Sequence, residues 1–153
     1  MLDIHPLNVW SRSDEEIGRL MSNFAYTPFL LDGVTYASLE GFYVSLLCQD
    51  ESKRRRAAKL WGLRAKHEIP KVKPSILCYG GEQFAPGSAA HHALIKRAMR
   101  AKLEAHPDLA QAFVATYPRP IVHDTGYPER PDTEFPHLVF CHLLTELRDE
   151  FRG

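Results

Sequence analysis

Residues 32–43 of the chain read DGVTYASLEGFY, a tight turn followed by a short strand and the start of a helix. An Asp-Gly pair between two short extended runs is a strong signal for a two-residue β-hairpin turn, which predicts a hairpin over residues 29–36. Ser38 is a favourable helix N-cap. The apolar residues after it recur at the spacing of one helix face: Leu39, Phe42, Tyr43, Leu46 and Leu47. The sequence therefore predicts an amphipathic helix whose first turn holds a carboxylate, Glu40.

Glu40 is the first candidate for a catalytic residue, and it has a purely structural alternative. An acidic residue in the first turn of a helix complements the helix dipole and stabilises it by about 0.3–1 kcal/mol. A carboxylate that borders an aromatic-rich apolar stripe is also placed where its protonation and reactivity are tuned for catalysis. The spacing alone leaves both interpretations open.

The composition bounds the class of protein. The 153 residues fit one domain with a real hydrophobic core, and 44% hydrophobic and 25% charged residues are ordinary for a soluble globular protein. Nineteen basic and nineteen acidic residues give a formal net charge of zero, so no global field favours nucleic acid or an anionic membrane. A local basic patch stays compatible with this balance.

Cysteine usage and the N-terminal residues predict a cytoplasmic location. Cys48, Cys78 and Cys141 are an odd number at wide spacing, as expected for free thiols in a reducing compartment. The first six residues have neither the basic start nor the apolar run of a signal peptide. No apolar segment approaches the length needed to span a bilayer, so no membrane contact is predicted.

The rest of the pattern predicts a helix-dominated α+β domain over residues 1–153, with about six helices and three short strands. Residues 69–87 read as a loop-rich region and residues 124–134 as a polar loop. A short strand is predicted at residues 120–123. The further helices are predicted over these ranges: 13–21, 51–61, 88–104, 107–117 and from about 136 to the end.

Taken together, these features resemble the NADAR (YbiA-like) family. That family has an aromatic residue after a short strand, then Ser-Asn-Phe, a hairpin, and Ser-x-Glu opening a helix. The corresponding positions here are Trp10, Ser22-Asn23-Phe24, Asp32-Gly33 and Ser38-Leu39-Glu40. The similarity continues in order along most of the chain, in Ala57-Ala58, Gly62, residues 97–104, Leu109, Ala115-Thr116 and residues 143–148.

The resemblance implies a YbiA-like fold and hydrolysis of a bond between a ribosyl carbon and a nitrogen. The substrates it implies are early phosphorylated riboflavin intermediates or ADP-ribose attached to guanine. The expected partners are therefore a small ribosyl or ADP-ribosyl compound, and also ADP-ribosylated nucleic acid. The resemblance implies no metal and no organic cofactor.

Glu40 is the expected catalytic carboxylate, and Asp124 or Asp132 would supply a second one, because C–N cleavage gains from carboxylates near the sugar. The residues expected to bind the substrate are Trp10, Asn23, Phe24, Tyr43, Trp61, Arg64, Lys66 and Arg100. The cations are included because a phosphorylated substrate needs them. Each aromatic has the alternative of a place in the core, and the run Arg54-Arg55-Arg56 is typical of a solvated helix face.

The sequence departs from the family pattern near its C-terminal helix. The family's Asp-x-x-Trp-Gly and Asn-x-Leu-Gly elements are replaced, and Leu138 and Cys141 stand where Asn and Gly belong. Gly41 also stands where the family commonly has histidine. Two alternatives to an enzyme therefore stay open: a non-catalytic binder of nucleotide or ADP-ribose on the same fold, and a nucleic-acid-contacting module that uses the basic residues of the long helix.

Histidines and cysteines do not predict a metal site. His137 and Cys141 are four residues apart on the last predicted helix, His142 follows, and His91 and His92 are adjacent elsewhere. A closed structural zinc site needs four convergent ligands, and nothing in the sequence supplies the rest of such a set.

Overall fold

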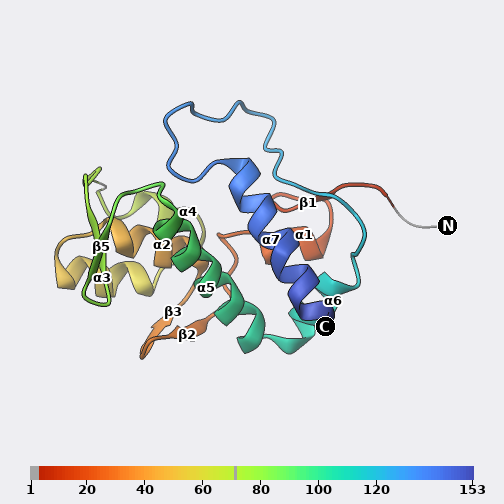
Figure 1. The fold of residues 1–153 in the computed structure, drawn as a ribbon, viewed down its shortest axis with the longest axis horizontal. Helices are drawn as coiled ribbons and strands as arrows, with labels where there is room; N and C mark the ends of the chain where they lie inside the picture. The colour runs from red at the N-terminus through yellow and green to blue at the C-terminus, as the bar shows by residue number, and fades with distance from the viewer. Residues whose placement is uncertain (1–3, 71) are drawn as a thin grey trace.

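The computed structural model describes residues 4–70 and 72–153 and consists mainly of helices, with three small two-stranded β-ladders at its periphery (Figure 1). Within those residues there are seven helices: α1 (Glu16–Met21), α2 (Leu39–Leu47), α3 (Glu51–Ala58), α4 (Gly62–His67), α5 (Ala89–Ala105), α6 (Pro107–Val114) and α7 (His137–Arg152). The six short strands are β1 (Leu7–Asn8), β2 (Phe29–Leu31), β3 (Val34–Tyr36), β4 (Leu77–Tyr79), β5 (Glu82–Phe84) and β6 (Ile121–Val122). The predicted class, a helix-dominated α+β domain, is confirmed.

The predicted hairpin is present as β2 and β3, which pair antiparallel with Leu31 opposite Val34. The two turn residues, Asp32 and Gly33, both have positive φ angles, of 49° and 82°. This backbone matches the right-handed twist of the flanking strands, which explains why Asp-Gly forms the turn.

The helix α2 begins as the sequence predicts. The Ser38 side chain accepts a hydrogen bond from the Gly41 amide at 2.9 Å, so it caps the first turn. The same hydroxyl donates to the Leu60 carbonyl at 2.8 Å. Ser38 thus joins the start of α2 to the link between α3 and α4.

The structure corrects three predicted helix boundaries and one predicted loop region. The first helix starts at Glu16 rather than at residue 13, and the sixth ends at Val114 rather than near 117. The helix predicted over 51–61 ends at Ala58, and a separate helix, α4, begins at Gly62, whose φ of 63° is not helical. The region 69–87 contains the hairpin β4–β5, whose turn, Gly80-Gly81, has positive φ at both positions.

The residue pattern does not predict the first strand, although the family resemblance implies a short strand before Trp10. Strand β1 pairs in parallel with β6, Leu7 opposite Ile121 and Asn8 opposite Val122. Each strand has two residues, too few for an alternating pattern to show in the sequence. The pairing brings the N-terminal residues onto the segment that precedes α7.

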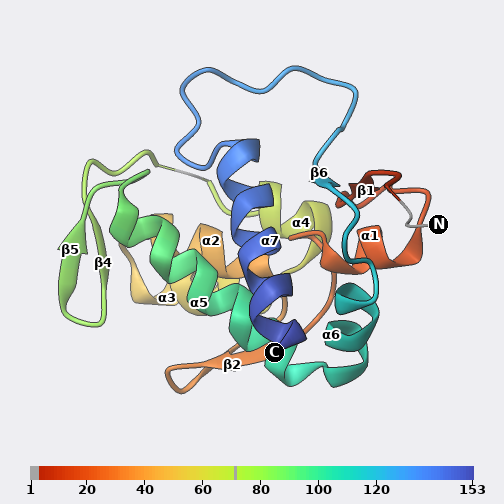
Figure 2. The ribbon, with the colours of Figure 1, turned by 45° about the vertical axis from the view of Figure 1, so that its right-hand side comes forward.

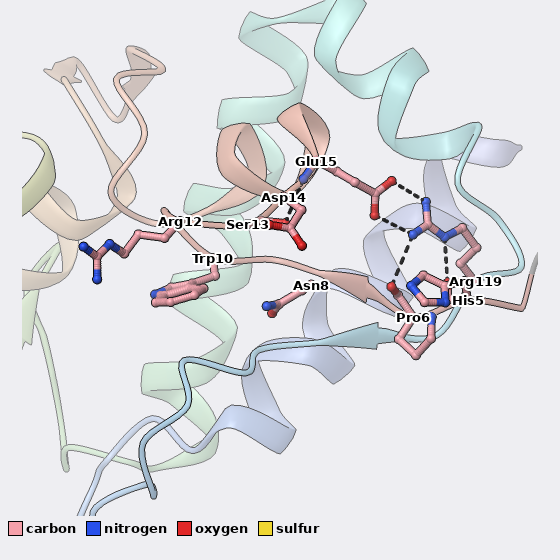
Figure 3. A pocket seen from close by; sticks show the side chains of 9 residues that line it. All are labelled: His5, Pro6, Asn8, Trp10, Arg12, Ser13, Asp14, Glu15 and Arg119. Carbon is pink, nitrogen blue, oxygen red and sulfur yellow. Dashed lines mark hydrogen bonds and ion pairs between the residues drawn. The ribbon is translucent and has the colours of Figure 1, made fainter.

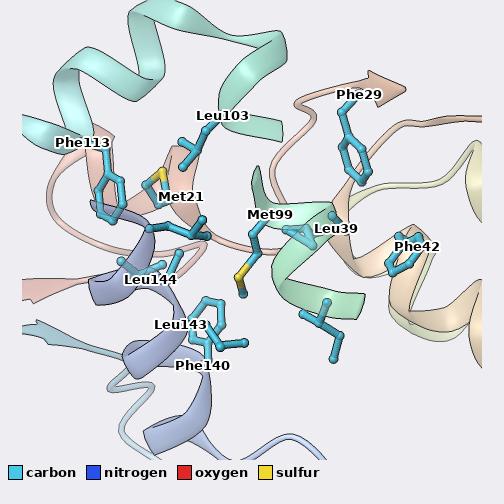
Figure 4. Close-up of a cluster of buried hydrophobic side chains, with 14 of the residues drawn as sticks. Met21, Phe29, Leu39, Phe42, Met99, Leu103, Phe113, Phe140, Leu143 and Leu144 are labelled. Carbon is cyan, nitrogen blue, oxygen red and sulfur yellow. The ribbon is translucent and has the colours of Figure 1, made fainter. Parts of the chain in front are cut away.

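The main core lies around α5, which packs against β2, α2, α6 and α7 (Figure 2). Its side chains come from nearly every element; those labelled in Figure 4 are Met21, Phe29, Leu39, Phe42, Met99, Leu103, Phe113, Phe140, Leu143 and Leu144. A smaller cluster joins α2 to α3 and α4 and contains Val44, Cys48, Ala57, Leu60, Ala65 and Ile69. The two clusters lie on different faces of α2, so that helix is held from both sides.

The segment between β6 and α7 arches away from the body of the molecule in both views (Figures 1 and 2). It has no regular secondary structure, as the sequence predicts for a polar loop. In the part of the chain described, no helix is long and apolar enough to cross a membrane.

Candidate functional site

The Ser22-Asn23-Phe24 loop and the Ser38-Leu39-Glu40 start of α2 are in contact in the structure. The Asn23 carbonyl accepts a hydrogen bond from the Glu40 amide at 2.9 Å, and the Phe24 carbonyl accepts one from the Gly62 amide at 2.9 Å. The first turn of a helix leaves its amides without intrahelical partners, so these carbonyls satisfy donors at the starts of α2 and α4. We call the residues gathered here, Ser22 to Phe24 with Glu40 and Tyr43, the Glu40 corner.

Gly41 lets α2 approach the α3–α4 link closely. A β-carbon at this position would lie 2.6 Å from the Ala57 carbonyl oxygen and 2.8 Å from the Leu60 carbonyl oxygen. Both are backbone atoms that cannot move aside without shifting the chain. The departure from the family pattern at Gly41 therefore has a packing reason in this molecule.

Tyr43 lies one helical turn after Glu40 and faces a row of rings. Its ring centroid is 5.7 Å from that of His91 and 6.1 Å from that of Phe135. Burial raises the pKa of the Tyr43 phenol, and the carboxylates of Glu134 and Glu40 raise it further. The phenol therefore keeps its proton throughout the neutral range and can donate a hydrogen bond beside Glu40.

Lys102 is a residue of this corner that the sequence analysis missed. Its side chain is fully buried, and its ammonium donates to the Ser22 carbonyl at 3.2 Å. In the described part of the chain no carboxylate pairs with it, and burial lowers the pKa of Lys102 to about 7. A signal was present in the sequence, because Lys102 falls eight residues after Leu94, on the apolar stripe of α5.

Asn23, which follows Ser22 in the chain, contributes a second buried polar group. Its side-chain oxygen, Oδ1, is inaccessible to solvent and has no hydrogen-bond partner among the described residues. A buried acceptor of this kind costs stability unless something donates to it. The contact of Asn23 with α2 is made by its main-chain carbonyl, so the side chain takes no part in it.

Phe24, Trp61 and Lys66 lie on the α4 side of the corner. The Lys66 ammonium is 5.9 Å from the centre of the Phe24 ring. Trp61 precedes Gly62 at the start of α4 and is 46% exposed, so it is not a core residue. Its ring packs at 4.8 Å on that of Tyr26, which is 60% exposed.

Two predicted binding cations point to other partners. Arg64 pairs with Glu68, four residues further on α4, at 2.7 Å. Arg100 pairs with Glu150 of α7 at 2.9 Å. Lys102 is two positions after Arg100, a rotation of about 200° around α5. Arg100 therefore faces away from the Glu40 corner.

The two predicted loop carboxylates, Asp124 and Asp132, belong to residues with different contact partners. Asp124 is exposed, and its backbone exchanges two hydrogen bonds with the Asn8 side chain at 2.9 Å. Asp132 is exposed and pairs with Lys73 at 2.9 Å, which lowers the pKa of that carboxyl. Neither carboxylate has a contact with Glu40 in the structure, and their roles stay predictions.

Trp10 lines a separate hollow of about 440 Å³ near the N-terminal segment (Figure 3). At the other end of that hollow, Arg119 makes two hydrogen bonds of 2.6–2.9 Å with the Glu15 carboxylate. The Glu40 corner contributes no residue to its lining. Trp10 therefore lines this hollow without Asn23 or Glu40.

The basic residues of the long helix α5 do not form an unpaired stripe. Lys96 contacts both Glu146 and Glu150, and Arg97 contacts Asp32 at 3.0 Å. Together with the Arg100 pair, these contacts neutralise the exposed face of α5. The condition for a nucleic-acid module built on this helix is not met.

In the residues that the structure describes, no three histidine, cysteine, aspartate or glutamate side chains are grouped as a metal site requires. His137 lies instead against His123, with ring centroids 4.5 Å apart. Burial raises the pKa of the Cys141 thiol to about 11, so that thiol is protonated at neutral pH.

Comparison with solved structures shows the fold. The NMR structure of the E. coli protein YbiA matches with a TM-score of 0.68 and 24% sequence identity, over 99% of this chain and 88% of that chain. A search of curated proteins finds no match. The sequence model of the family described as bacteriophage protein GP30.3 matches residues 16–149, which is most of the chain. The protein therefore belongs to the bacteriophage protein GP30.3 family.

Proposed function

We propose that this protein hydrolyses the N-glycosidic bond between a ribosyl carbon and a nitrogen in a ribosylated or ADP-ribosylated nucleobase-like compound. The observation that carries the proposal is the backbone contact of Glu40 with Asn23, which places this half-buried glutamate where α2 meets the Ser-Asn-Phe loop. The resemblance of these same motifs to the NADAR family supports the class of reaction. The YbiA-like fold is consistent with it.

Two side chains of the Glu40 corner, Glu40 and Tyr43, are suited to steps of this hydrolysis. Cleavage passes through an oxocarbenium-like transition state, water bonds to the ribosyl carbon, and the departing nitrogen takes up a proton. The Glu40 carboxylate can orient a ribose hydroxyl or accept the proton of the attacking water. The Tyr43 phenol, which stays protonated, can donate a hydrogen bond to the sugar.

Lys102 is fully buried, so its place in this scheme is to hold the Ser-Asn-Phe loop through the Ser22 carbonyl. Asp124 and Asp132 are second-carboxylate candidates, and they are tested after Glu40 because both are exposed.

The test is a hydrolysis screen of ribosylamine phosphates and ADP-ribosyl-guanosine, with substrate binding measured in parallel. The variants are Glu40→Gln and, as the matched control, Glu16→Gln. Glu16 is also an acidic residue in the first turn of a helix, α1, so it tests the dipole effect without touching the corner. Glu40→Gln is expected to lose at least about 100-fold in turnover with binding retained, while Glu16→Gln keeps full turnover. Release of no base by folded wild-type protein from any of these substrates would contradict the proposal.

A second candidate function is a binder of nucleotide or ADP-ribose without turnover. The observation that favours it is the exposed and altered loop before α7, where Asp132 is held by Lys73 at the surface. In the same experiment, equal binding by wild type and Glu40→Gln with no turnover by either identifies the binder.

A further inference from the structure

The positive charge of this neutral chain is concentrated on α3 and α4. Residues 51–68 contain seven lysines and arginines and two glutamates, a formal net charge of +5 in a chain whose total is zero. Apart from Arg54, which is half-buried, these cations are exposed. Charge of one sign on a pair of adjacent helices creates a local field for anions that the overall balance hides.

The arginines of this segment are partly engaged, whereas the lysines are available. Arg55 pairs with Glu51, and Arg56 and Arg64 share the single carboxylate of Glu68. Within residues 4–70 and 72–153, no carboxylate pairs with Lys53, Lys59 or Lys66. The surface therefore presents three unneutralised ammonium groups to solvent.

Two exposed aromatic rings belong to the same region of the fold, Trp61 in the link between α3 and α4 and Tyr26 packed against it. Trp61 follows Lys59 by two residues, and Tyr26 packs on it with the two ring planes tilted by 54°. Lys66 lies over Phe24, whose carbonyl holds the start of α4 at Gly62. We call Tyr26, Trp61, Lys59 and Lys66 the aromatic–lysine platform.

We propose that the aromatic–lysine platform binds single-stranded nucleic acid, with bases stacked on Trp61 and Tyr26 and phosphates held by Lys59 and Lys66. Flat rings between cations match a strand of alternating bases and phosphates, because every base has a face that stacks and every phosphate has a charge. A duplex hides the faces of its bases from such rings. An acidic peptide or an anionic lipid surface would use the lysines and leave the two rings without a function.

The platform is continuous with the Glu40 corner through one short loop. Phe24 contacts α4, and its neighbour Asn23 contacts Glu40. A strand bound on the platform would therefore run past the proposed ribosyl site. The binding itself does not depend on the proposed hydrolysis, so Glu40→Gln is expected to bind oligonucleotide as wild type does.

The test is fluorescence anisotropy with a labelled oligothymidylate of about 12 nucleotides, at several salt concentrations. Trp61→Ala is expected to weaken binding by roughly 5- to 100-fold, as the loss of one stacked base does. Its matched control is Tyr127→Ala, which removes an aromatic that is 80% exposed in the loop between β6 and α7. The double variant Lys59→Gln/Lys66→Gln is expected to reduce the salt slope by about 1.4, at about 0.7 for each phosphate that a lysine no longer neutralises. Arg97→Gln/Arg152→Gln has the same change in charge and is expected to leave the slope unchanged.

Three results would overturn the proposal, with circular dichroism used to establish that each variant is folded. The first is the absence of salt-dependent binding of the oligonucleotide by wild type. The second is equal affinity for the single strand and for its duplex. The third is binding that Trp61→Ala does not weaken, with heparin bound as tightly as the oligonucleotide, since this would reveal a site for anions of any kind.

Discussion

Lys102 is a cationic side chain at a core position, and its burial has a consequence for stability. The ordinary pKa of a lysine is 10.5, and burial lowers that of Lys102 to about 7. Between pH 7 and 10.5 the unfolded chain therefore binds more protons at this residue than the folded chain, so the contribution of Lys102 to the free energy of unfolding rises with pH across that window.

The variant Lys102→Met tests this directly. It keeps the apolar stem and removes the amine, and the Ser22 carbonyl still accepts the Ala25 amide at 3.2 Å. At pH 7 the variant is expected to be more stable than wild type by about 1–3 kcal/mol, and the difference shrinks toward pH 10. Urea unfolding at both pH values measures it. A difference that is the same at pH 7 and pH 10 would contradict the buried-amine explanation.

Gly41 gives a second prediction at the level of one residue. In Gly41→Ala the new methyl group meets two backbone carbonyl oxygens at less than 3.0 Å, so α2 has to move away from the α3–α4 link. The expected cost is about 1–3 kcal/mol. Thermal unfolding measures this cost. A melting temperature equal to that of wild type would show that the α3–α4 link shifts to admit the methyl group at little cost.

At the scale of the helix, Ser38 does two things, and a comparison with Ser88 separates them. Both residues are N-caps: Ser38 accepts from Gly41 and Ser88 from His91. Ser38 also donates a buried hydrogen bond to Leu60, 22 residues away. Ser38→Ala is therefore expected to cost about 1 kcal/mol more than Ser88→Ala, the typical net worth of that additional bond. Equal costs in denaturant unfolding would mean that only the cap matters.

At the scale of the whole molecule, Arg119 joins segments that are far apart in sequence. Its guanidinium donates to the His5 and Pro6 carbonyls and to the Glu15 carboxylate. Arg119→Ala is expected to lower the free energy of unfolding by about 2–4 kcal/mol, because the buried Arg119 side chain makes all of these hydrogen bonds. Arg55→Ala, which removes an exposed pair, is the control and is expected to stay within about 1 kcal/mol of wild type.

The same variant tests whether residues 1–153 unfold as one domain. Tryptophan fluorescence and far-ultraviolet circular dichroism report on different parts of the fold, and their transitions are expected to coincide for wild type and for Arg119→Ala. Two separate transitions would show that the segment held by Arg119 unfolds independently of the main core.

The sequence by itself determined the features that depend on neighbouring residues. Asp32-Gly33 predicts the hairpin because its backbone geometry is local, and Ser38 predicts the start of α2 because a cap acts within three residues. The long helices α5 and α7 follow from apolar periodicity over more than three turns. Neighbouring residues also made Glu40 a candidate, but they do not show which distant residues it contacts.

Only the tertiary structure decided which of these local pieces meet. The pairing of Leu7 with Ile121 and the contact of Lys102 with Ser22 join residues about 80 or more positions apart, and no short pattern encodes them. A rotation of about 200° around α5 separates Arg100 from Lys102, so Lys102 falls on the buried face while Arg100 pairs with Glu150 of α7. Glu40 lies against the Ser-Asn-Phe loop because the Asn23 carbonyl accepts a hydrogen bond from its amide, and this bond exists only when the loop and the helix have folded together.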